Sequence, residues 1–280
     1  MTTTRTHTRS ALHPDPAVLG EAWRELVEAE YEQVERLREW HEQDYYAPIA
    51  HHFADDPRRT DDPVLNLLRE MSRPNATWVD IGAGGGRYAL PLALVSKQVI
   101  AIEPSEGMRE VLQSGMAQHG IENVEINALR WPEGSDQVSA DLSLMAHVGY
   151  DIRDINAFLD GTERATRERC VMVMMDRAPS AGFTQLWDDI HGEHRYQLPG
   201  FRELGILLLA RGATPEIRLV PRSFPPMDDE HIRNDARRRL WLSEGSEKDQ
   251  RVQRLLDGLL LAGTDSFGYP SVIAVVSWEP

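Results

Sequence analysis

Between residues 76 and 178, short apolar runs alternate with segments long enough to form helices. The runs indicate strands near 77–81, 98–102, 123–127, 140–146 and 170–175. Strands joined by helix-length connections cannot form hairpins, so they pair in parallel with helices on both faces of the sheet. This alternation therefore predicts an α/β fold, doubly wound around a mostly parallel sheet.

Helical patterns flank this core on both sides. From Pro16 to about Gln43, apolar and aromatic residues recur at steps of three and four, which predicts an amphipathic helix. A second helix begins at Pro63, after a carboxylate that can cap it. Beyond the core we expect a helix near 201–211, a strand in "EIRLVP", a helical region over 228–262 and a buried last strand in "SVIAVVSWE".

These patterns also suggest a domain organisation. We expect a disordered tail over 1–15, an N-terminal helical cap over 16–75 and one domain over 76–280. Insertions at 179–200 and 225–268 would form the acceptor site of that domain. The basic run "DARRRLW" within the second insertion is a solvated helix face or a site for a substrate carboxylate.

The balance of charge limits the partners of the chain. Lys+Arg 30 against Asp+Glu 45 gives a formal net charge of -15, and such a surface repels phosphate backbones and anionic lipid headgroups. No apolar stretch reaches the roughly 20 residues that a spanning helix needs. The one cysteine, Cys170, excludes an internal disulfide or a thiolate metal cluster. We expect a cytoplasmic protein that binds neither nucleic acid nor membrane, and its oligomeric state stays open.

A glycine-rich loop follows the first predicted strand, in the stretch "TWVDIGAGGGRYALPLA". Glycine is used where the backbone turns tightly or a ligand comes close. The dinucleotide fingerprint needs a third glycine where Arg87 stands, and no phosphate-loop G-K-[ST] follows. What remains is G-x-G-x-G on Gly82, Gly84 and Gly86, preceded by Asp80.

The second predicted strand ends in Glu103, which is followed by Ser105 and Met108. A carboxylate at that strand end can accept hydrogen bonds from both hydroxyls of a ribose. Together the two segments resemble motif I and the acid-x-Ser-x-x-Met pattern of class I S-adenosylmethionine-dependent methyltransferases, in particular the domains of ubiquinone and menaquinone biosynthesis. The resemblance covers about residues 76–178 and implies a Rossmann-like methyltransferase fold of seven strands with an antiparallel last strand.

The resemblance implies S-adenosyl-L-methionine as cofactor and methyl transfer to a small-molecule O, N or C nucleophile. The glycine loop would pack on the methionyl part, and Met108 would lie near the adenine, whose edge would face "ALRWPEG" through its backbone and the Trp131 ring. Tyr46 covers the cofactor or packs in the core. The expected cofactor-binding residues are Tyr46, Asp80, Gly82, Ala83, Gly84, Gly86, Glu103, Pro104, Met108, Leu129, Arg130, Trp131, Ala146 and His147. Alternatives are a non-catalytic cofactor-binding sensor or partner subunit, and a nicotinamide-dependent oxidoreductase, which Arg87 disfavours.

Catalytic candidates follow the fourth predicted strand. His147 could act as a base, because imidazole titrates near neutrality, or it could simply hydrogen-bond the cofactor or a helix. Tyr150 could orient an acceptor hydroxyl or pack, whereas Asp151 is better suited to cap the next helix. His191 and His194 have a spacing of two metal ligands, but the glycine between them weakens a helix there, so we expect no metal site.

Overall fold

One mixed sheet forms the centre of the molecule. A computed structural model describes residues 13–40, 55–222, 228–262 and 267–280. In this part of the chain seven strands pair in the order β3-β2-β1-β4-β5-β7-β6. They are β1 (Thr77–Ile81), β2 (Gln98–Ile102), β3 (Val124–Asn127), β4 (Ala140–Ala146), β5 (Thr166–Met175), β6 (Glu216–Pro221) and β7 (Val272–Trp278). The first five strands are parallel, and β7 runs antiparallel to β5 and β6. The predicted α/β fold with an antiparallel last strand is confirmed.

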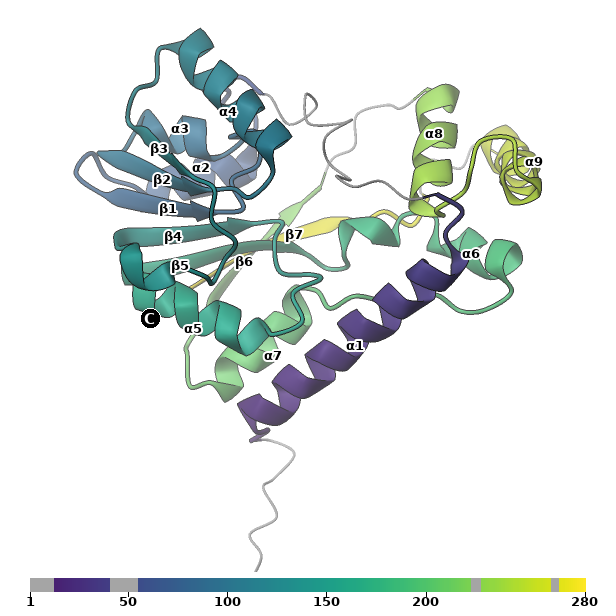
Figure 1. Ribbon diagram of the computed structural model, residues 1–280, viewed down its shortest axis with the longest axis horizontal. Helices are drawn as coiled ribbons and strands as arrows, with labels where there is room; N and C mark the ends of the chain where they lie inside the picture. Colours follow the sequence, from purple (N-terminus) through teal and green to yellow (C-terminus); the bar gives the residue numbers. More distant parts are fainter. Residues whose placement is uncertain (1–12, 41–54, 223–227, 263–266) are drawn as a thin grey trace, which may run out of the picture.

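Helices cover both faces of this sheet (Figure 1). Their bounds are α1 (Pro16–Leu37), α2 (Pro63–Met71), α3 (Ala89–Ala93), α4 (Glu106–His119), α5 (Ile155–Ala165), α6 (Thr184–His191), α7 (Phe201–Ala210), α8 (Asp229–Arg239) and α9 (Glu247–Leu261). Side chains of α1, α5 and α7 join one buried apolar cluster with the sheet, and side chains of α2, α3 and α4 join another. None of the described helices combines the length and apolarity needed to cross a bilayer.

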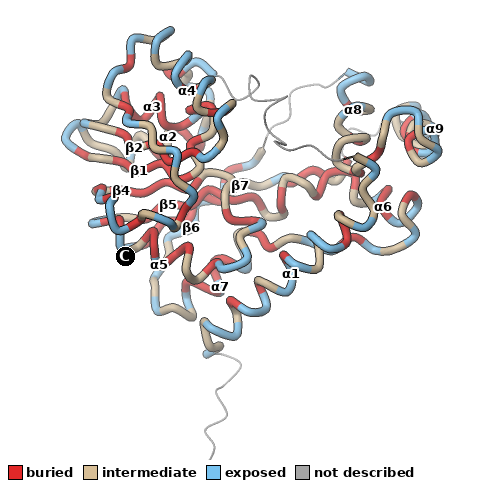
Figure 2. Tube along the Cα trace, in the orientation of Figure 1, coloured by how far each residue is buried: buried red, intermediate tan, exposed pale blue. Residues whose placement is uncertain are grey.

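A third apolar cluster lies beyond the carboxyl ends of the parallel strands. It joins α6, α8 and α9 with Val34 at the end of α1 and with Phe267 and Tyr269. These segments follow β5, follow β6 or precede β7, so the chain enters and leaves them at one edge of the sheet. Figures 1 and 2 show α6, α8 and α9 gathered at one side, with buried residues where they meet. We call this cluster of helices the cap.

Three predicted boundaries are wrong, each for a local reason. Helix α1 ends at Leu37, because the next residues are extended and the Glu39 N–H donates to the Trp241 carbonyl. The region over 228–262 is two helices, with Trp241 at a φ of 58° in the break and Ser246 capping α9. Strand β5 begins at Thr166, before the apolar run that predicted it.

Candidate functional site

The glycine loop joins β1 to α3 and is fixed to β2 by backbone bonds. The N–H groups of Gly82 and Ala83 donate to the Ile102 carbonyl at 2.8 and 3.1 Å. Gly82, Gly84 and Gly86 have φ values of 76°, 55° and 89°, which side chains rarely adopt.

The three loop glycines differ in what lies against them. A Cβ on Gly82 would lie 2.5 Å from the Val148 side chain, and one on Gly86 would lie 2.5 Å from the Leu112 side chain. Glycine at these two positions therefore allows other side chains of the protein to pack directly against the loop backbone. A Cβ on Gly84 would meet only the Met108 sulfur, at 3.9 Å. Gly84 therefore leaves the most room for the expected close approach of a ligand, and the roles of Gly82 and Gly86 in cofactor binding stay predictions.

Glu103 lies at the end of β2, is 7% exposed and links two loops. Its Oε2 accepts the Gly84 N–H at 2.8 Å, and its Oε1 accepts the Ser105 N–H at 2.8 Å. Each carboxylate oxygen can accept a second hydrogen bond, so the group can still bind hydroxyls. Ser105 in turn caps α4, whose Met108 is buried beneath Gly84.

Asp80 is the most perturbed carboxylate at this edge. It is 2% exposed, and its Oδ1 has no hydrogen-bond partner among the described residues. Burial, followed by the negative charge of Glu103, raises the pKa of Asp80 to about 7. A buried, unsatisfied oxygen beside a second carboxylate is costly, and a positively charged ligand would relieve that cost. This donor set fits a cofactor that carries a ribose and positive charge.

The segment after β3 differs from what its sequence suggested. The Trp131 indole is buried against α5, where its Nε1–H donates to the Thr162 hydroxyl at 3.1 Å. Leu129 is half-buried beside Gly134, and Arg130 is exposed. The Trp131 ring is therefore committed to the core, so an adenine contact from this segment would come from its backbone.

The end of β4 places His147 at a φ of 60°, with its N–H bonded to the Val173 carbonyl at 2.8 Å. The His147 Nδ1 is buried and has no partner among the described residues. Burial, then the positive charges of Arg87 and Arg222, lowers the pKa of His147 to about 4. This shift makes the ring neutral at pH 7 and a weaker base than the sequence suggested, and the catalytic role of His147 stays a prediction.

Tyr150 is buried, and its hydroxyl accepts the Met175 N–H at 2.7 Å. Burial raises the pKa of Tyr150, so its phenol stays protonated and can still donate one hydrogen bond. The predicted capping role of Asp151 is wrong. Asp154 caps α5 instead, through the Ala157 N–H at 3.0 Å.

The other sequence candidates lie elsewhere or outside the described residues. Tyr46 belongs to the segment 41–54, which the structure does not describe. His191 ends α6, and its ring bonds to the Leu240 carbonyl at 3.0 Å. His194 lies beyond the end of α6 and pairs with Asp188 of that helix. Within the described ranges, no three His, Cys, Asp or Glu residues are grouped to hold a metal ion.

A network of charged side chains lies beside the glycine loop and was not predicted from the sequence. Asp62, which caps α2, accepts from Arg59 at 3.1 Å and from Arg87 at 3.2 Å. Arg59 also donates to the Arg87 carbonyl at 3.0 Å, and both guanidinium groups lie over the Tyr88 ring. The network fixes Arg87, whose charge acts on His147.

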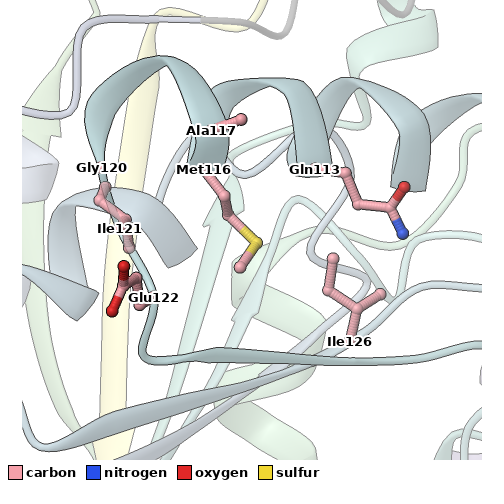
Figure 3. A pocket seen from close by; sticks show the side chains of 7 residues that line it. All are labelled: Gln113, Met116, Ala117, Gly120, Ile121, Glu122 and Ile126. Carbon is pink, nitrogen blue, oxygen red and sulfur yellow. The ribbon is translucent and has the colours of Figure 1, made fainter.

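A hollow of about 500 Å³ lies away from these residues, between α4 and β3 (Figure 3). Its lining is mainly apolar and includes Met116, Ile121 and Ile126. It contains none of the expected cofactor-binding residues. We therefore place the candidate site at the carboxyl edge of the sheet, where Asp80, Glu103 and the glycine loop meet.

Comparison with known proteins shows similarity to methyltransferases over part of the chain. Residues 79–174 match a family model described as a methyltransferase domain. A probable ribosomal RNA small subunit methyltransferase A of Methanosphaera stadtmanae is 37% identical over 68 residues, which are 24% of this chain. The chain matches only 25% of the length of that relative.

Solved structures share the fold. A putative methyltransferase from Bacillus halodurans C-125 aligns with a TM-score of 0.54 at 16% identity, over 77% of this chain and 98% of its own. Magnesium protoporphyrin IX methyltransferase from Synechocystis PCC 6803, solved with bound S-adenosylhomocysteine, aligns with a TM-score of 0.51 at 13% identity, over 95% of this chain and 100% of its own. At these identities the likeness shows the architecture alone.

Proposed function

We propose that this S-adenosylmethionine-dependent methyltransferase transfers the methyl group of its cofactor to a small molecule at the carboxyl edge of the sheet. The observation that carries the proposal is the buried Oδ1 of Asp80, which has no partner among the described residues and lies beside Glu103 and Gly84. A ligand with positive charge and vicinal hydroxyls satisfies both carboxylates at once.

Within this site we assign each group a separate contact. Glu103 binds the ribose hydroxyls with its remaining lone pairs, and Asp80 faces the positive charge of the amino-acid part. The loop backbone over Ala83 and Gly84 accommodates the tail, while Pro104 and Met108 line the adenine side, together with backbone after β3. Bound there, the cofactor supplies an electrophilic methyl group with a neutral thioether as leaving group.

We assign the acceptor pocket to the cap and the N-terminal helices. The segments 16–75, 179–200 and 225–268 would supply it, because the helices of the cap follow β5 and β6 at the carboxyl edge of the sheet. Correct placement of two reactants can supply about 7 to 11 kcal/mol of the barrier, so a site without a strong base is still effective. His147 and Tyr150 then position the acceptor, with Ala146 forming the floor.

The overall charge supports a small acceptor over RNA. A formal charge of -15 opposes the approach of a phosphate backbone, although a quarter of the ribosomal RNA methyltransferase relative is similar to this chain. Cys170 is buried, and it is the one cysteine of the sequence, which suits a reducing cytoplasm.

Isothermal titration with S-adenosylmethionine and S-adenosylhomocysteine tests the cofactor site. Glu103→Ala should weaken both by about 1 to 3 kcal/mol, because the ribose hydroxyls lose their acceptor. Glu125→Ala is the matched control, since Glu125 is an exposed carboxylate on the neighbouring strand β3. Equal affinities for wild type and Glu103→Ala would contradict the assignment.

Transfer of labelled methyl groups tests the acceptor. The enzyme is incubated with labelled S-adenosylmethionine and either a protein-free metabolite extract or purified ribosomal RNA. We expect label in the metabolite extract and none in the RNA. Label in the RNA alone would replace the proposed acceptor class.

A further inference from the structure

Arg222 holds a fixed position at the carboxyl edge of the sheet, next to the proposed acceptor pocket. It directly follows β6, and its backbone N–H donates to the Ser271 carbonyl at 2.9 Å. Its guanidinium donates to the Pro270 carbonyl at 3.4 Å and lies 3.9 Å from the Met175 sulfur. The cation therefore lies over the adjoining ends of β5, β6 and β7.

This end of the sheet also holds the two polar side chains that follow β4, Tyr150 and His147. Tyr150 accepts the N–H of Met175, whose sulfur contacts Arg222. The positive charge of Arg222 also acts on His147, in the same direction as that of Arg87. Two arginines from distant parts of the sequence thus impose a positive potential at the buried Nδ1 of His147, which has no partner in the part of the chain that the structure describes.

A third cation approaches from the cap. Arg239 on α8 stacks over the Tyr269 ring at 5.3 Å, and Asp235 binds its Nε at 2.7 Å. Burial and the nearby charge of Arg239 lower the pKa of Arg222, so the two guanidinium groups repel each other. Asp235 balances the charge of Arg239, so Arg222 is the cation of this group that lies over the ends of β5, β6 and β7.

We propose that the methyl acceptor is an organic acid whose carboxylate or phenolate oxygen receives the methyl group, and that Arg222 is the residue that selects for this charge. The inference rests on the proposed function and names the acceptor class of that same site. A guanidinium binds a carboxylate or a phenolate through charge-assisted hydrogen bonds, and burial strengthens them.

The chemistry is consistent with this acceptor. A neutral alcohol needs a base, and His147 is a weak one, whereas an oxyanion is already a nucleophile. The oxyanion forms a bond to the methyl carbon while the sulfur–methyl bond breaks and its electron pair stays on sulfur. A methyl ester or ether and S-adenosylhomocysteine result, the negative charge of the oxyanion and the positive charge of the sulfonium are both neutralised, and no proton moves.

The test uses the full chain, labelled S-adenosylmethionine and a metabolite extract divided by anion exchange into a retained and an unretained fraction. We expect label in products of the retained fraction, and these products should elute earlier on a second run because one negative charge is lost. Arg222→Gln should raise the acceptor KM so that kcat/KM falls about 10- to 100-fold, and Arg222→Lys should recover part of it. The affinity for S-adenosylhomocysteine should change less than about twofold.

Arg218→Gln is the matched control, because Arg218 is an exposed arginine within β6 that pairs with Glu216. It should behave as wild type. Label confined to the unretained fraction, or an unchanged rate in Arg222→Gln, would overturn the inference while the proposed function stands. Absence of S-adenosylhomocysteine binding and of label in both fractions would instead remove the proposed function, and the inference with it.

Discussion

Asp80→Asn replaces a buried carboxylate by a neutral group of the same shape. The pKa of Asp80 is about 7 in the folded chain, against an ordinary value of 3.8. Between these two pH values the folded state retains a proton that the unfolded state has lost, so the free energy of unfolding falls as the pH rises. At 1.36 kcal/mol per pH unit, the total loss by neutral pH is about 4 kcal/mol.

The variant removes this pH-dependent loss. We expect it to match wild type below about pH 4, to gain about 1.4 kcal/mol per pH unit above that, and to level off above about pH 7. Urea denaturation of the cofactor-free chain between pH 4 and 8.5 measures the difference. The same variant should bind S-adenosylmethionine more weakly, by about 1 to 3 kcal/mol, because the ligand's positive charge loses its counter-charge.

Two results would refute this reasoning. One is a variant that is less stable than wild type by the same amount at every pH, since Asp80 would then form a favourable bond in the folded chain. The other is unchanged cofactor affinity. Glu125→Gln serves as the control for pH effects on an exposed carboxylate of the same sheet.

Three further predictions follow from the site and its supports. Gly82→Ala should lower the thermal midpoint by several degrees, whereas Gly84→Ala should chiefly weaken cofactor binding. Scanning calorimetry measures the first effect and isothermal titration the second. A larger loss of stability in Gly84→Ala and a larger loss of affinity in Gly82→Ala would contradict the prediction. Glu30→Ala should lower the free energy of unfolding by about 3 kcal/mol, because it removes the carboxylate that lies 3.2 Å from the Arg195 side chain, which is 2% exposed. Urea denaturation measures this loss, and a value below about 1 kcal/mol would contradict the prediction. The pH profile of kcat/KM should have the same shape near pH 6.5 in wild type and in His147→Asn, because the pKa of His147 is about 4, and an inflection there that disappears in His147→Asn would contradict this.

The sequence predicted the sheet well where strands are apolar throughout. Strands β1, β2 and β4 match the predicted ranges, because burial on both faces makes their sequences mainly apolar. The start of β5 was missed because Arg167 and Glu168 are polar there. They pair with Asp141 and Arg73 instead of contributing to the core.

The site was predictable where its residues follow a strand directly. The glycine loop and Glu103 were proposed in this way, and residues 79–174, which include both, match a model described as a methyltransferase domain. Arg222 also follows a strand, but its position at the sheet edge depends on contacts with Pro270 and Met175. These residues lie 48 and 47 positions away in sequence, so no local pattern reveals the contacts. The Trp131 ring was assigned to the adenine because no local pattern reveals that its indole bonds to α5.

The position of β7 between β5 and β6 has a consequence for synthesis on the ribosome. The first five strands can pair as they emerge, since each adds to a neighbour already made. Strand β6 emerges next but has no neighbour until β7, more than fifty residues later, inserts beside it. Until then the free edge of β5 and both edges of β6 have no hydrogen-bonded neighbour. This interval is therefore the stage at which a nascent chain would most need a chaperone.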